Sequence, residues 1–141
     1  MDIVLSRKSI AAAAAKAAVE AAVAHAGALN KAVVAAVVDG SGDLVALLRA
    51  DGAFKASIGI ARDKAYTAAV FGASTDDLSA ALIANPTLHQ GISMQPGVIL
   101  FGGGLPMVVD GHVIGGIGVS GGSENDDRAC AQAGLGALGL G

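Results

Sequence analysis

The stretch that most limits the fold of this chain is FGGGLPMVVDGHVIGGIGVSGG, which begins at Phe101. It holds two apolar runs separated by Asp110-Gly111, and this dipeptide predicts a β-hairpin because a type I′ turn needs positive φ at both central residues. The glycines on either side remove side chains from the strand ends, so another backbone or a small molecule can come close. We therefore expect residues 102–106 and 115–122 to wall a ligand pocket.

The rest of the chain alternates between helix-forming and strand-forming segments. Helices are predicted from Ser6 or Ser9 to Ala28 with Gly27 as the stop, over 54–71, from Ser74 or Thr75 to a point before Asn85-Pro86, and from Ser123 or Asn125 through Leu140. Strands are predicted over 32–38 and 44–49, and a three-strand meander begins at 98–101, after an irregular loop over 87–97. The pattern predicts one α+β domain over 1–141, with a five-stranded antiparallel sheet and about four helices, mainly on one face.

The amino-acid composition indicates which kinds of molecule the protein can bind. With 53% hydrophobic and only 15% charged residues, we expect apolar surface patches and hence a homo-oligomer, a dimer or larger. The net charge of −3 and the scattered lysines and arginines argue against nucleic acid. No uncharged apolar run is long enough to span a membrane, no leader pattern is visible, and Cys130 stands alone, which together predict a cytoplasmic protein with no membrane partner.

A few titratable side chains are candidates for a site. Arg62 and Tyr66 lie four residues apart on one predicted helix face, whereas Lys64 projects elsewhere. A phenol beside a cation can bind a carboxylate and donate a proton, although a solvated helix edge explains the same residues. His89 has the best claim among the three histidines, since one imidazole is enough for an axial contact to haem iron. No spacing suits a structural metal site, so none is predicted.

Other patterns have structural explanations. The sequence G-x-G-x-x-G over 116–121 closes a hairpin and lacks the βαβ unit that a dinucleotide site requires. Glu124 and Asp126 are expected to cap the last helix, while Asp127 is placed to turn back toward the glycine loops. Cys130 is expected to be a buried, inert thiol.

The pieces ARDKAYTAAVFG, FGGGLPMVVDGHVIGGIGVSGG and DDRACAQAGL, in this order over Ala11–Leu140, resemble the GlcG/HbpS-like family, also called the haem-degrading domain. The resemblance implies an α+β sandwich with a five-stranded antiparallel sheet, assembled into dimers or larger oligomers. It also implies haem binding, an accessory role in a catabolic operon or, as in a few members, lyase activity. The matching motif positions are Lys64, Tyr66, Thr67, Gly103, Gly104, Pro106, Gly118, Ser120 and Asp127. The iron-binding acidic pair of the haem-sensing members has no counterpart.

Three functional hypotheses follow, and whether the chain is an enzyme stays open. The first is a binding protein that holds haem or a planar carboxylate in a glycine-walled pocket at a subunit interface. There, Arg62 or Lys64 would pair with a carboxylate, backbone N–H groups of Gly103 and Gly104 would bind an oxygen, and the other ligand-binding candidates are His89, Pro106, Gly118 and Ser120.

The second hypothesis is a cofactor-free lyase or isomerase acting on a small aromatic or carboxylate substrate. Tyr66 or Asp127 would then be catalytic and move the proton, while Lys64 or Arg49 would hold the acid. The third is an oligomeric scaffold in which the glycines serve tight packing.

Overall fold

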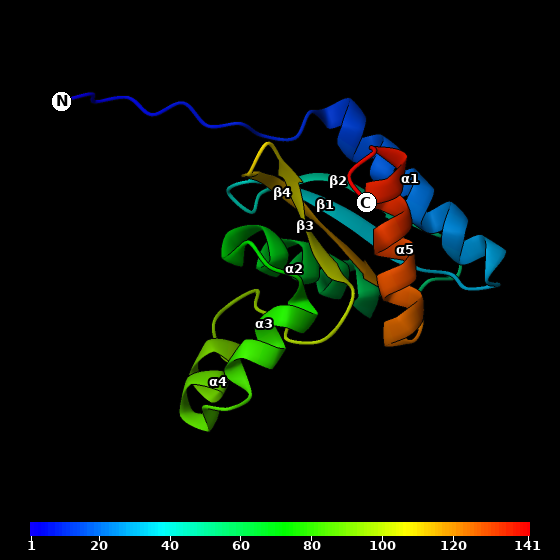
Figure 1. Ribbon diagram of the computed structural model, residues 1–141. Coiled ribbons are helices and arrows are strands. Elements are labelled where there is room, and N and C mark those ends of the chain that lie inside the picture. The colour runs from blue at the N-terminus through cyan, green and yellow to red at the C-terminus, as the bar shows by residue number, and fades with distance from the viewer.

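A computed structural model describes residues 1–141 of the protein. Four strands form one antiparallel sheet in the order β2-β1-β4-β3, with helices on both of its faces (Figure 1). No helix has the length and apolar character needed to cross a bilayer. The strands are β1 (Val34–Asp39), β2 (Leu44–Arg49), β3 (Gly104–Val109) and β4 (His112–Ser120), and the helices are α1 (Ala12–Ala28), α2 (Ala56–Phe71), α3 (Thr75–Leu82), α4 (Pro86–Ser93) and α5 (Glu124–Ala137).

Both predicted hairpins are confirmed. Asp110 and Gly111 connect β3 to β4 with φ values of 51° and 77°, which is the pair of positive angles that the type I′ turn requires. In the β1–β2 connection, the Asp39 carboxylate accepts the backbone N–H groups of Ser41 and Asp43 at 2.9 and 3.1 Å. Local turn chemistry therefore fixes both hairpins.

The α+β class with an antiparallel sheet is confirmed, but the predicted five strands and four helices are wrong by one each. Residues 98–101 form no strand, since Ile99 donates its N–H to the Thr67 hydroxyl of α2 at 3.0 Å instead of to a neighbouring strand. The loop expected over 87–97 contains α4, whose start is stabilised by Pro86 in the first turn and by the Asn85 side chain, which accepts the Leu88 N–H.

The expected start of the first helix is wrong, whereas its expected end at Ala28 is confirmed. The helix starts at Ala12 after Ala11, which provides no side-chain cap, so neither Ser6 nor Ser9 caps it. It continues one residue past Gly27, and Asn30 in the left-handed region (φ 57°) follows its end.

The helices do not lie mainly on one face, as the sequence had predicted. On one side, Ala35 and Val37 of β1 join α1 and α5 in the main hydrophobic core; on the other, Ala36 and Val38 contact Ala residues of α2. Strand β1 is therefore apolar at almost every position, because it is buried on both faces.

Glycines of β4 set how closely α2 approaches the sheet. A Cβ added at Gly118 would overlap the Ala61 carbonyl oxygen, and one added at Gly116 would overlap the Ala65 carbonyl oxygen. The backbone of α2 thus rests directly on β4, with no side chain between them. These glycines serve close packing within one copy of the chain, and they do not wall the hollow that the sequence had suggested.

We expect Gly118→Ala to lower the free energy of unfolding by about 1–3 kcal/mol, because the new methyl group forces α2 away from β4. Urea unfolding followed by circular dichroism measures the change. The matched control is Gly136→Ala in α5, where a Cβ meets no atom within 4 Å. This control should raise stability by up to about 1 kcal/mol, the helix-propensity difference between the two residues. Equal effects of the two substitutions would contradict the close-packing role of Gly118.

Candidate functional site

Helix α2 separates the predicted site residues into two groups. Residues two apart on a helix point about 200° away from one another, so Lys64 faces the sheet while Arg62 and Tyr66 face outward. The Lys64 side chain is 1% exposed, whereas that of Arg62 is 52% exposed. The candidates therefore lie on opposite sides of one helix and do not form a single site.

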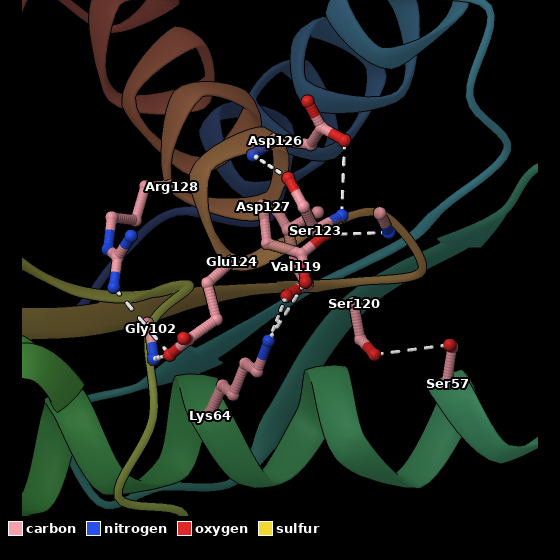
Figure 2. A network of polar contacts seen from close by, with 12 residues as sticks. Ser57, Lys64, Gly102, Val119, Ser120, Ser123, Glu124, Asp126, Asp127 and Arg128 are labelled. Carbon is pink, nitrogen blue, oxygen red and sulfur yellow. Dashed lines mark hydrogen bonds and ion pairs between the residues drawn. The ribbon is translucent and has the colours of Figure 1, made fainter.

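Beneath α2, Lys64 forms a buried ion pair with Asp127. Figure 2 shows the lysine rising from α2 toward the end of β4 and the first turn of α5. Its Nζ donates to the Asp127 carboxylate at 3.1 Å and to the Val119 carbonyl oxygen at 2.8 Å, and it lies 5.0 Å from the centre of the Phe101 ring. The second Asp127 oxygen accepts the Gly122 N–H at 3.0 Å, so this carboxylate does turn back toward the glycine loop.

Burial works against both charges of this pair. Desolvation lowers the pKa of Lys64, and the attraction of the Asp127 carboxylate only partly offsets it. Desolvation also raises the pKa of Asp127, against the Gly122 N–H and the lysine, which both lower it. Each group alone would tend toward its neutral form, so the ion pair depends on the presence of both partners.

Polar contacts from α3 and α5 hold the glycine loop next to this pair. Gly102 donates its N–H to Glu124 at 2.8 Å, and Gly104 donates to the Thr75 hydroxyl at 3.1 Å. Arg128 binds both Asp76 oxygens at 2.7 Å. The loop is thus fixed between two helices.

The remaining members of this inner group are close-packed. A Cβ at Gly103 would lie 2.7 Å from the Val119 carbonyl oxygen and 2.8 Å from Lys64 Nζ. Ser120 is buried and donates its hydroxyl to Ser57 at 3.1 Å. Pro106 lies in β3, at the edge of the sheet. These contacts leave little space for a ligand between residues 102–106 and 115–122.

A pocket of about 310 Å³ lies on the outward side of α2. The Tyr66 ring is wedged between Gly42 and Gly97, where an added Cβ would come within 2.6 and 3.0 Å of ring carbons. Arg62 stands beside the ring, and its Nε lies 3.6 Å from the Asp63 carboxylate. The pocket therefore combines an aromatic wall, an accessible guanidinium and one carboxylate; its lining residues are Gly42, Arg62, Asp63, Tyr66, Pro96 and Gly97.

His89 and Cys130 lie away from this pocket. His89 is half-buried on α4 and lines neither the Tyr66 pocket nor the larger pocket of about 500 Å³ beside α4, whose lining is Asn85, Thr87, Leu88, Gly91, Ile92 and Gln95. Cys130 is buried in α5, and desolvation raises its pKa to about 11, as expected of an inert thiol. No three His, Cys, Asp or Glu side chains gather at one point.

The ion pair is the feature that the sequence analysis missed. Its signal was present, since Lys64 falls three residues after Ala61 and four before Ala68, inside the apolar stripe of α2. A charge at such a position is expected to have a buried partner. Asp127 occupies a comparable place, three residues before Cys130 on the buried face of α5.

We expect the pair to show strong coupling in a double-mutant cycle. Lys64→Met or Asp127→Leu alone should lower the free energy of unfolding by about 3–5 kcal/mol, because each leaves one buried ionisable group without its partner, to be held as a charge or neutralised at a cost. The double variant should lie close to the wild type or above it, because it buries two apolar side chains instead. Urea unfolding at neutral pH measures all three; losses that simply add would refute the coupling.

The titration of Asp127 gives a second prediction. Its pKa in the folded protein should lie above the ordinary value of 3.8. At a pH between 3.8 and the pKa of Asp127 in the folded protein, folding takes up a proton. The stability that Asp127 contributes is therefore complete below pH 3.8 and is lost as the pH rises through the pKa of the folded protein. Carbon-13 NMR of the carboxyl group measures the midpoint. Lys64→Met should raise it further, since the lysine lowers it; a midpoint below 3.8 would overturn the desolvation argument.

Comparison with known proteins shows the family to which the chain belongs. The family model described as haem degrading protein HbpS-like matches residues 10–136. An uncharacterized 15.0 kDa protein from the dhaT-dhaS intergenic region of Citrobacter freundii is 39% identical over 109 residues, 76% of each chain. The crystal structure of Klebsiella pneumoniae protein ORFY superposes with a TM-score of 0.92 at 33% identity, covering 99% of this chain and 97% of that one. A crystal structure of a PduOC–haem complex gives 0.85 at 32% identity, covering 94% and 97%. The chain belongs to the HbpS-like family, as its motifs on α2, in the glycine loops and on α5 had predicted.

Proposed function

We propose that the protein binds a small planar ligand that carries a carboxylate, with haem as the leading candidate, in the pocket formed by Arg62 and Tyr66. The observation that carries this proposal is the accessible guanidinium beside an aromatic ring in a pocket of about 310 Å³. A similar protein of the same fold, PduOC, has been crystallised with haem, which supports haem as the ligand.

The chemistry of the lining suits one edge of such a ligand. The Arg62 guanidinium can bind a carboxylate through two parallel N–H groups. Its present neighbour, the half-buried Asp63 carboxylate, lies 3.6 Å away, and an ion pair this close to the surface is weak and easily exchanged. The Tyr66 ring offers a flat apolar surface for stacking.

Haem fits this lining only in part. Pockets for drug-sized ligands begin at about 300 Å³, so this one covers a carboxylate-bearing edge and not a whole macrocycle. The lining contains no His, Cys or Met that could bind iron. We therefore propose that a second copy of the chain covers the rest of the ligand, and that the protein works as a homo-oligomer.

A second candidate function is a cofactor-free lyase or isomerase for a small aromatic or carboxylate substrate. The observation that favours it is the Tyr66 phenol at the pocket wall, a group that can donate a proton to a bound substrate. Asp127, the other catalytic candidate, lies on the opposite side of α2 and is engaged by Lys64. In this alternative, Tyr66 alone would move the proton.

Haem titration tests the proposal. We expect a Soret band to develop with the wild type and saturate, and Arg62→Gln to weaken binding by about tenfold, because one charge-assisted hydrogen-bonding group is lost. Lys16→Gln is the matched control, since Lys16 is an exposed cation of α1 that lies far outside the pocket lining; it should leave binding unchanged.

Benzoate serves as a second probe, followed by NMR shifts of the Tyr66 ring. Saturable benzoate binding without a Soret response would identify a planar acid in place of haem. If neither probe binds, or if Arg62→Gln and Lys16→Gln behave alike, the proposed pocket is wrong. Loss of an enzymatic turnover in Tyr66→Phe with benzoate binding intact would favour the catalytic alternative.

A further inference from the structure

The first nine residues form an arm that contacts little of its own chain. Figure 1 shows this arm leaving α1 and running out past the body of the molecule. It carries three large apolar side chains in a row, and Ile3, Val4 and Leu5 are 90%, 79% and 72% exposed. A run of β-branched and apolar residues left in water calls for a covering surface.

The outer edge of β2 is a surface that such an arm can cover. Strand β2 pairs only with β1, so its other side presents unpaired backbone N–H and C=O groups. The strand contains no Pro or Lys to discourage pairing, and its Leu44 and Leu48 are 50% and 36% exposed. The opposite edge, β3, contains Pro106, which lacks an N–H to donate.

Charges specify one antiparallel register between the arm and β2. Placing Asp2 opposite Arg49 sets Ile3 against Leu48 and Leu5 against Ala46. At the other end, Asp43 then meets Lys8. The β1–β2 register skips Val45, which forms a bulge in β2. If the arm follows the same bulge, its pairing beyond Val45 shifts by one position, and Arg7 instead of Lys8 lies opposite Asp43. Both ends therefore match opposite charges across the pair.

The arm is directed away from the β2 edge of its own chain. Ile10 donates its N–H to the Ile114 carbonyl at 3.0 Å, and Lys8 lies 3.8 Å from Asp110 in the β3–β4 turn. In the sheet order β2-β1-β4-β3, this turn belongs to the β3 edge of the sheet, and β2 forms the opposite edge. The contact to Asp110 is exposed on both sides, so it is weak enough to be exchanged for another carboxylate.

We propose that residues 2–8 add as an antiparallel strand to the β2 edge of a second copy of this chain. Two copies can exchange arms reciprocally, because each offers one arm and one open edge, and the contact then closes as a twofold dimer. Backbone hydrogen bonds would hold the strand in place, and the Asp2–Arg49 pair would select the register. This inference rests on the proposed self-association but is independent of the proposed ligand.

A charge swap in the full-length chain tests the register. Asp2→Arg alone and Arg49→Asp alone should each raise the dissociation constant of the dimer by about tenfold, because attraction becomes repulsion at two symmetric sites. The double variant Asp2→Arg with Arg49→Asp should recover most of the affinity. Sedimentation velocity over a concentration series measures all of them. A monomeric wild type would refute self-association itself, whereas an oligomer that ignores both single reversals would refute only the role of the arm.

Disulfide trapping distinguishes exchange between copies from folding back within one. Ile3→Cys with Leu48→Cys should give a covalent dimer on mild oxidation, seen by non-reducing electrophoresis. Ile3→Cys with Leu44→Cys is the matched control, out of register by four residues, and should stay uncrosslinked. A cross-linked monomer from the first variant would show that the arm binds its own β2, and equal cross-linking of the two variants would refute the register.

Discussion

The direct contact between the α2 backbone and β4 governs the placement of the three candidate side chains of α2, which are Arg62, Lys64 and Tyr66. Because Gly116 and Gly118 leave no side chain between helix and strand, α2 can neither rotate nor withdraw without opening a gap. The residues of α2 that face the sheet are therefore fixed. The Lys64 side chain accordingly lies in the narrow space beside Val119 and Asp127. The same constraint turns Arg62 and Tyr66 outward, so one packing contact creates both the buried pair and the outer pocket.

Much of the fold could be predicted from local chemistry. The Asp110-Gly111 turn and the end of α2 at Phe71 appear where they were predicted. Ser74 and Ser123, each one of two predicted starts, cap α3 and α5. The missed α4 had a local signal in Asn85 and Pro86, whereas the missing fifth strand depends on a tertiary contact. Residues 98–101 are apolar enough for a strand, but Thr67 of α2 takes the Ile99 N–H, and no local pattern reveals a competitor 32 residues away.

The candidate site was predicted as a set of residues but not as an arrangement. Helical spacing alone places Arg62 with Tyr66 and sets Lys64 apart, and the structure keeps that division. The glycines of residues 102–106 and 115–122 were interpreted as leaving space for a ligand. A missing Cβ, however, permits either a ligand or another backbone to approach. The choice between the two depends on which element lies opposite, and only the topology supplies the Ala61 and Ala65 carbonyls that fill the space next to β4.

The buried pair of Lys64 and Asp127 constrains how three elements of the fold lie relative to one another. Lys64 and Asp127 together connect α2, the end of β4 and the start of α5, and each would be strongly unfavourable without the other. Moving any one of these elements relative to the others would therefore break a hydrogen bond of the pair. The Thr67 hydroxyl of α2 donates to the Gly97 carbonyl at 3.0 Å, which ties this lining residue of the Tyr66 pocket to the same helix. The pocket is thus held in shape from two sides before any ligand arrives, and a preformed pocket gives up less conformational freedom on binding.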